Sequence, residues 1–136
     1  MKLIVCLDDN DGMLFGGRRQ SKDRALRRRV LQLADAQKLW MNNYSAGQFV
    51  EDEAHITVDE AFLDKASEND FCFVENTEIR PYLQRITGLV LYRWNRAYPS
   101  DVKFPTALLA GRWRKLSSVD FTGFSHERIT EEIYSL

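Results

Sequence analysis

The sequence predicts an α/β domain, and three observations support this class. Residues 3–7, LIVCL, form a short apolar run bounded by Asp, Asn and Gly, which is typical of a strand buried on both faces. Residues 24–34 carry apolar side chains at helical spacing, and residues 38–41 form a second apolar run. A strand, helix, strand series is the unit that produces a parallel pair, so we expect a mostly parallel central sheet.

Length and composition predict one domain over residues 1–136 with an ordinary hydrophobic core. The chain has 44% hydrophobic and 12% aromatic residues. Nineteen basic residues against twenty acidic ones give a net charge of -1, so no overall field favours nucleic acid or membrane. Cys6 and Cys72 lie inside apolar runs, and we expect buried free thiols. No apolar stretch reaches the roughly 18 residues that a membrane span requires, and the start lacks a signal-peptide pattern, so the expected location is cytoplasmic.

Helix signals follow along the chain. The helix at residues 24–34 is expected to pack its aliphatic stripe on the sheet and turn its arginines toward solvent. Capping boxes predict helix starts at Ser45 and Thr57, and the acidic residues 50–54 are expected to be weakly structured. The other expected elements are strands at residues 71–74 and 88–98, a short helix through 79–83 with Pro81 in its first turn, a strand or turn near 117–118, and a final strand at 127–134 whose pattern also fits a helix.

Several stretches, in order, resemble dihydrofolate reductase. They are the opening LIVCLDDNDGMLFGG, Asp23 at the first helix start, residues 58–61, and residues 89–105 ending in DVKFP. The resemblance implies a three-layer sandwich with a central mostly parallel sheet and an antiparallel C-terminal strand, reduced in size. It also implies a substrate cleft beside the first loop and helix, lined by Cys6, Met13, Leu14, Asp23, Leu26 and Tyr92.

Departures from that family argue against its reductase activity. The Gly-Gly pair that lets cofactor phosphates approach the backbone is Glu75-Asn76 here, and a carboxylate there would repel a pyrophosphate. The family's phosphate-holding Gly-Arg is Asn42-Asn43, and Tyr92 replaces a Thr. Between residues 49 and 56 roughly two dozen residues of the family's adenosine-binding part are absent. We therefore expect no cofactor, with a NADPH-dependent reductase of a pterin-like substrate as the alternative.

Two charged groups offer further hypotheses. Asp23 could bind an amidine-like ring such as a pterin or assist proton transfer, or it could simply favour the helix start. A basic set could grip phosphates or RNA, or form a solvated face; its members are Arg18, Arg19, Lys22, Arg24, Arg27, Arg28 and Arg29. Asp8, Asp9 and Asp11 lack the spacing of a metal loop and predict a polar turn.

Aromatic and histidine residues give weaker signals. Trp40, Trp94 and Trp113 are expected in the core or at its rim, with an outward-facing Trp94 that lines a patch or a dimer interface as the alternative. His126 is expected on a surface loop. A second resemblance is to short Firmicutes proteins that carry the name ribonuclease Z. That enzyme needs a histidine-rich zinc cluster, but His55 and His126 are the only histidines and stand seventy-one residues apart, so we expect no metal.

Together these features predict a non-catalytic, small-ligand-binding or protein-interaction module on a dihydrofolate reductase-like scaffold. The partner would be an unidentified small molecule or protein, with a homodimer as one option and no membrane. The alternatives are the reductase and the binding of RNA or another polyanion by the arginines.

Overall fold

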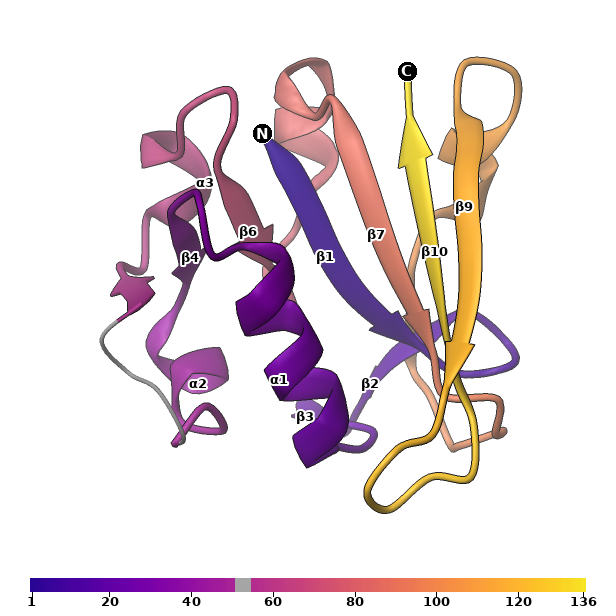
Figure 1. Ribbon diagram of the computed structural model, residues 1–136. Helices are drawn as coiled ribbons and strands as arrows, with labels where there is room; N and C mark the ends of the chain where they lie inside the picture. Colours follow the sequence, from indigo (N-terminus) through magenta and orange to yellow (C-terminus); the bar gives the residue numbers. More distant parts are fainter. Residues whose placement is uncertain (51–54) are drawn as a thin grey trace.

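The computed structural model describes residues 1–50 and 55–136 and contains two β-sheets (Figure 1). The strands of the large sheet are β1 (Lys2–Leu7), β4 (Leu39–Met41), β5 (Ile56–Val58), β6 (Phe71–Phe73), β7 (Gly88–Arg93), β9 (Arg114–Phe121) and β10 (Ile129–Ser135). The strands of the small sheet are β2 (Gly12–Phe15), β3 (Arg18–Arg19) and β8 (Val102–Lys103). The helical elements are α1 (Arg24–Leu33), α2 (Asn43–Ala46), α3 (Phe62–Lys65) and the 3₁₀ helices η2 (Arg80–Arg85) and η3 (Thr106–Leu109).

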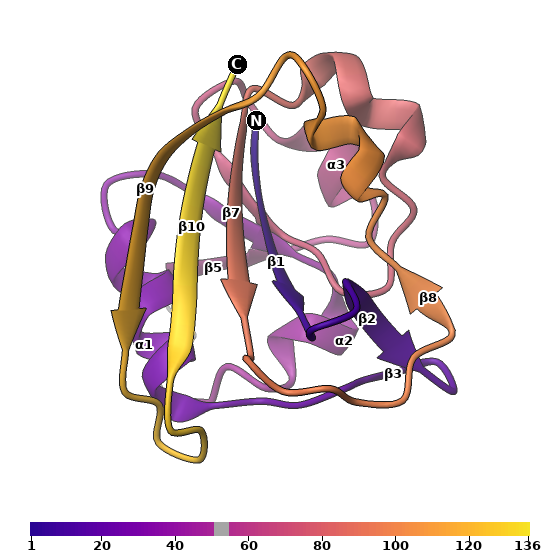
Figure 2. The ribbon, with the colours of Figure 1, turned by 90° about the vertical axis from the view of Figure 1, so that its right-hand side faces the viewer.

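The large sheet has the order β5-β4-β6-β1-β7-β10-β9, so the apolar opening strand is central as predicted. β1 pairs in parallel with β6 and β7, and β4 pairs in parallel with β5 and β6. β10 runs antiparallel between β7 and β9. The predicted α/β class, with its mostly parallel sheet and antiparallel C-terminal strand, is confirmed. Figure 2 shows the small sheet beside the carboxyl end of β1.

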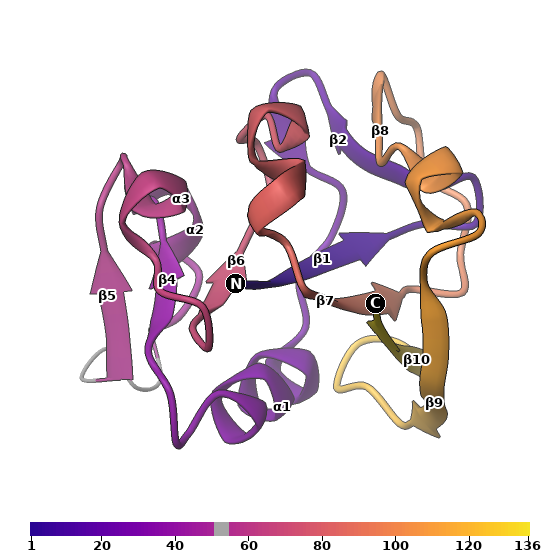
Figure 3. The same cartoon turned by 90° about the horizontal axis from the view of Figure 1, so that it is seen from above.

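Two apolar cores lie on opposite faces of the large sheet. On one face α1 packs Leu26 and Val30 against Ile4 and Phe73. On the other face α3 and η2 cover residues such as Leu3. Figure 3, seen from above, shows these two layers of helix with the sheet between them. The alternation of β1 side chains between the two faces explains why its whole run is apolar.

Both expected capping boxes are wrong in position. α2 starts two residues before Ser45, and its N-cap is Asn42, whose side chain accepts the Ser45 N–H. Thr57 lies in β5 opposite Trp40, because the parallel ladder satisfies its backbone better than a local cap. Asp59 instead accepts the Ala61 N–H just before α3. Most of the weakly structured segment expected at residues 50–54 lies outside the described residues.

Two predictions of exposed side chains, for the α1 arginines and His126, also need correction, and Trp94 takes the expected core position rather than the outward-facing alternative. Arg24 and Arg28 on α1 are exposed, but Arg27 is buried and Arg29 reaches a carboxylate of β10. Trp94 is 3% exposed and His126 is 4% exposed, and their rings stack at 4.5 Å. The strand pattern could not reveal this burial, since it depends on the loop before β10 folding back over β7.

Both cysteines are free, and Cys72 is fully buried in β6. Burial raises the pKa of the Cys72 thiol to about 12, so the reactive thiolate is scarce at neutral pH. We expect Cys72 in the folded protein to react with a thiol reagent more than about a hundredfold more slowly than in the unfolded chain. Mass spectrometry of time points, with Cys6→Ala as background, measures this. Rapid native labelling at Cys72 would contradict the packing described.

Candidate functional site

The polar loops that follow β1, β4 and β6 meet at one edge of the large sheet, because parallel strands bring their carboxyl ends together. Eight residues line a cavity there: Cys6, Met13, Arg19, Gln20, Ser21, Val74, Glu75 and Trp94. Its volume is about 10 Å³, enough for no more than a single water molecule. The space beside Cys6, Ser21 and Trp94 is therefore filled by the chain's own side chains. A neighbouring cavity of about 200 Å³ at the same edge is lined by residues that include Met13, Leu14, Glu75 and Asn76.

The structure separates the six residues expected to line the cleft. Cys6 and Met13 line the small cavity. Leu14 and Leu26 are buried, and Tyr92 is fully enclosed in the core beneath α1. Asp23 is also buried, at the start of α1, where it serves as N-cap. The six side chains do not surround a common space among the described residues.

Glu75 forms a buried ionic cluster where the resemblance places cofactor phosphates. Arg19 Nε donates to Glu75 Oε2 at 2.9 Å, and Arg19 Nη2 donates to Oε1 at 3.2 Å. Ser45 Oγ donates to Oε1 at 2.8 Å, and the Arg19 guanidinium lies 4.3 Å from the centre of the Tyr44 ring. The cation and the hydroxyl that could hold a phosphate are thus already engaged by a carboxylate.

The two asparagines at the neighbouring loop are similarly occupied. Asn42 Nδ2 donates to Asn76 Oδ1 at 2.8 Å, which ties the loop after β4 to the loop after β6. The Asn43 N–H donates to Glu60 Oε2 at 2.8 Å. The residues at this edge do not fit a dinucleotide, because its pyrophosphate would have to displace both the Glu75 carboxylate and this amide pair.

Asp23 is the most densely hydrogen-bonded carboxylate described. Oδ1 accepts the N–H groups of Ala25 at 2.8 Å and Leu26 at 3.3 Å, which caps α1. Oδ2 accepts the Ser125 N–H at 2.8 Å and lies 2.9 Å from His126 Nδ1. Burial alone would raise the pKa of Asp23, but hydrogen bonds from Phe124, His126, Ser125 and Leu26 outweigh it and hold the pKa well below its ordinary value.

His126 extends this network into a chain of Ser, His and Asp side chains. Ser21 Oγ lies 3.0 Å from His126 Nε2, a spacing seen in hydrolytic triads. Tyr98 Oη competes for the same nitrogen at 3.1 Å. The cavity beside Ser21 has a volume of about 10 Å³, too small for an acyl group. The hydrogen-bonded side chains of Ser21, His126 and Asp23 therefore join the loop before α1 to the loop before β10, and we assign them a structural role.

A second buried network joins α1 to β10. Tyr92 Oη donates to Glu131 Oε2 at 2.8 Å. Arg29 binds the same carboxylate with both arms, Nε to Oε2 at 2.7 Å and Nη2 to Oε1 at 3.1 Å. Burial and the neighbouring Glu131 raise the pKa of the Tyr92 phenol, so it remains a donor. Tyr92, a departure from the reductase pattern, thus hydrogen-bonds the Glu131 carboxylate that Arg29 of α1 binds.

The basic residues do not form one free patch. Arg19 and Arg29 are engaged by Glu75 and Glu131, and Arg27 is buried. Arg18 and Arg28 are exposed. The charges available to a polyanion are therefore fewer than the sequence indicates.

The acidic residues after β1 form the polar turn that was predicted. Asp8 is buried and accepts the N–H groups of Asn10, Gly12 and Tyr98. Asp11 pairs with Arg93. Within residues 1–50 and 55–136, no group of three His, Cys, Asp or Glu side chains could hold a metal ion, so the name ribonuclease Z has no support.

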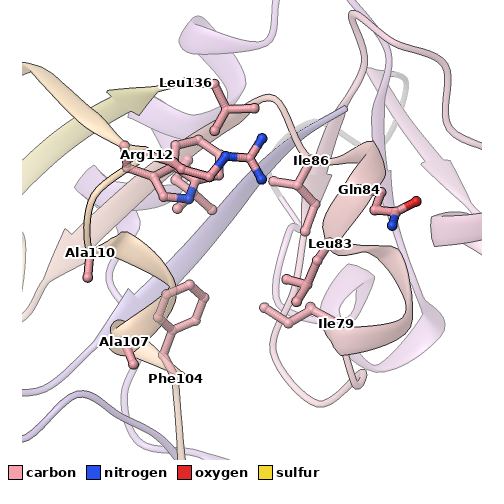
Figure 4. A pocket seen from close by; sticks show the side chains of 11 residues that line it. Ile79, Leu83, Gln84, Ile86, Phe104, Ala107, Ala110, Arg112 and Leu136 are labelled. Atoms are coloured by element: carbon pink, nitrogen blue, oxygen red, sulfur yellow. The ribbon is translucent and has the colours of Figure 1, made fainter.

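A larger cavity lies elsewhere, between η2 and η3 on the face of the sheet away from α1 (Figure 4). Its volume is about 400 Å³, within the range of small-molecule sites. The lining is mostly apolar and consists of Ile79, Leu83, Gln84, Ile86, Leu89, Phe104, Ala107, Ala110, Arg112, Trp113 and Leu136. We call it the η2–η3 pocket. Sequence reasoning missed it because its residues come from four separate segments, each of which resembles ordinary core.

No protein-family model and no curated protein matches the sequence. Among solved structures, the chain is similar to the dihydrofolate reductase from Enterococcus faecalis complexed with NADP(H) and RAB-propyl. The TM-score is 0.68 over 98% of this chain and 94% of that one, at 11% sequence identity. No helix in the described parts is long and apolar enough to cross a membrane. At this identity the similarity concerns the fold alone, and the chain has a dihydrofolate reductase-like fold.

Proposed function

We propose that this protein is a non-catalytic small-molecule-binding module, a dihydrofolate reductase-like domain with a reduced adenosine-binding part that binds its ligand in the η2–η3 pocket. The observation that carries the proposal is the size and the apolar lining of this pocket. At the carboxyl edge of the sheet, one cavity measures about 10 Å³ and its neighbour about 200 Å³, whereas the η2–η3 pocket measures about 400 Å³. A ligand-binding site needs a concave, largely apolar space of several hundred Å³, and the η2–η3 pocket provides it.

The pocket has the construction of a preformed site. Ile79, Ile86, Leu89 and Phe104 are each at most 5% exposed, so its floor is part of the core. η2 and η3 form its two walls, as Figure 4 shows. A rigid apolar floor lowers the entropic cost of ordering the site when a ligand binds.

A thermal-shift titration tests the proposal against the reductase alternative. A ligand at a thousand times its Kd adds about 4 kcal/mol to the free energy of unfolding, a readily measured rise in melting temperature. We expect no shift with NADPH or folate, and shifts with apolar fragments that fill the pocket. A saturable shift with NADPH would contradict the proposal and would make reductase assays the next step.

Blocking the pocket gives a sharper prediction. Ala107 is exposed at the pocket wall, and a tryptophan in its place is expected to fill the space and weaken fragment binding more than about tenfold, with little change in stability. Ala36, an exposed alanine after α1, provides the matched control in Ala36→Trp. Binding constants from ¹H–¹⁵N chemical-shift titrations measure the effect. Equal binding by both variants would place the fragments outside the pocket.

A further inference from the structure

The η2–η3 pocket contains one charged side chain, Arg112. Figure 4 shows its guanidinium group extending from the η3 side toward η2, in the direction of Ile86. Gln84 and the indole N–H of Trp113 are the other polar groups of the lining, and the lining includes no Asp or Glu side chain. The pocket thus combines a large apolar surface with a single cation.

Arg112 differs from the arginines of η2. Arg80 pairs with Glu78, and Arg85 donates to the carbonyl oxygens of Leu63 and Ala66. Within the described parts of the chain, the Arg112 guanidinium makes no hydrogen bond or ion pair with another side chain. Its five donors are available at the wall of the pocket.

From this arrangement we propose that the pocket binds an amphipathic carboxylate, with its apolar body on the floor and its carboxylate on Arg112. The inference rests on the proposed function, because it specifies the ligand of the same pocket. A planar guanidinium matches a carboxylate with two parallel hydrogen bonds, whereas it gives no such pairing to an alcohol and repels an ammonium group. The apolar floor supplies affinity and Arg112 supplies selectivity for charge.

Three eight-carbon probes that differ in their head groups test this inference: octanoate, 1-octanol and octylammonium. Each is titrated into the folded protein at fixed salt, and ¹H–¹⁵N chemical shifts report both the Kd and the location. We expect octanoate to bind about five- to tenfold more tightly than octanol, and octylammonium to bind least, since the guanidinium is partly exposed to solvent. The perturbed amides should belong to η2, η3 and β7.

Matched variants assign the charge effect to Arg112. Arg112→Gln should bring octanoate down to the affinity of octanol and leave octanol unchanged. Arg114→Gln, two positions along the chain, removes an exposed arginine outside the pocket lining and should change neither. The melting temperature of each variant shows whether it is folded.

The outcomes separate this inference from the proposed function. Equal affinity for octanoate and octanol, or an Arg112→Gln variant that retains the preference, would overturn the carboxylate assignment while leaving the pocket as a binding site. Absence of localised shifts with all three probes would overturn both.

Discussion

Asp23→Ala is expected to lower the free energy of unfolding by about 3–5 kcal/mol, because it removes a buried carboxylate and leaves several buried hydrogen-bond donors without an acceptor. The carboxylate is 2% exposed and is the shared acceptor for the start of α1 and for the loop before β10. Without it, the N–H groups of Phe124 and Ser125 and the His126 ring lose a buried partner. A side chain at Gly123 cannot fill the space left by the carboxylate, since its Cβ would lie 2.7 Å from the His126 carbonyl oxygen.

Urea unfolding followed by circular dichroism measures this effect, and the corresponding fall in melting temperature is about 10–20 °C. Asp35→Ala, which removes an exposed carboxylate just beyond α1, is the matched control and should change stability by less than about 0.5 kcal/mol. Asp23→Asn provides a milder variant, because it keeps the shape and one acceptor oxygen. Equal stability of Asp23→Asn and the wild type would contradict the assigned role of the charge.

The same carboxylate makes stability depend on pH. Because the pKa of Asp23 is lower in the folded state, its contribution is fully present above about pH 4, the ordinary pKa of an unfolded Asp, and is lost as the pH falls below that value. The wild type should therefore lose more stability between pH 5 and pH 3 than Asp23→Asn does. If the free energy of unfolding falls equally with pH in the two proteins, Asp23 is not the group that titrates.

Glu131→Ala is expected to cost about 2–4 kcal/mol. The substitution leaves the buried Tyr92 hydroxyl without its acceptor and frees Arg29 from a two-armed ion pair. The Arg29 side chain is 34% exposed, so water can solvate it once Glu131 is removed. Most of the loss of stability should therefore come from the unpaired Tyr92 hydroxyl.

Chemical denaturation of Glu131→Ala, Tyr92→Phe and the double variant separates the two contributions. Tyr92→Phe alone should cost about 1–2 kcal/mol, and the double variant should cost less than the sum, because the two side chains share one hydrogen bond. The exposed Glu127 provides the control Glu127→Ala. Additive losses would show that Tyr92 and Glu131 do not interact in solution.

Local sequence patterns predicted the main architecture well. The apolar run before Asp8 is the central strand, the runs at β6 and β7 are its parallel partners, and the run at β4 pairs in parallel with β6. These strands are buried on both faces, so their composition is apolar throughout and readily recognised. The capping-box signals were less reliable. Ser45 and Thr57 fit capping boxes, but Ser45 lies within a helix and Thr57 lies in a strand.

The site was less predictable, because it depends on pairs far apart in the chain. Arg19 meets Glu75 across 56 positions, and Asp23 meets His126 across 103. Glu75 was expected to repel a phosphate, but nothing in the sequence assigned Arg19 to neutralise it. His126 was expected at the surface because a single histidine in a polar segment carries no periodic signal.

The sequence by itself determined the central opening strand, its apolar neighbours at β4, β6 and β7, and the first helix, since periodicity and burial act over a few neighbouring residues. Only the tertiary structure decided which space is open. At the carboxyl edge of the sheet, ion pairs and hydrogen bonds between distant loops fill the space beside Glu75 and Ser21. The η2–η3 pocket exists because two short 3₁₀ helices leave a gap between them above the apolar core. A cavity is the volume that no side chain fills, and that depends on the packing of all its neighbours at once.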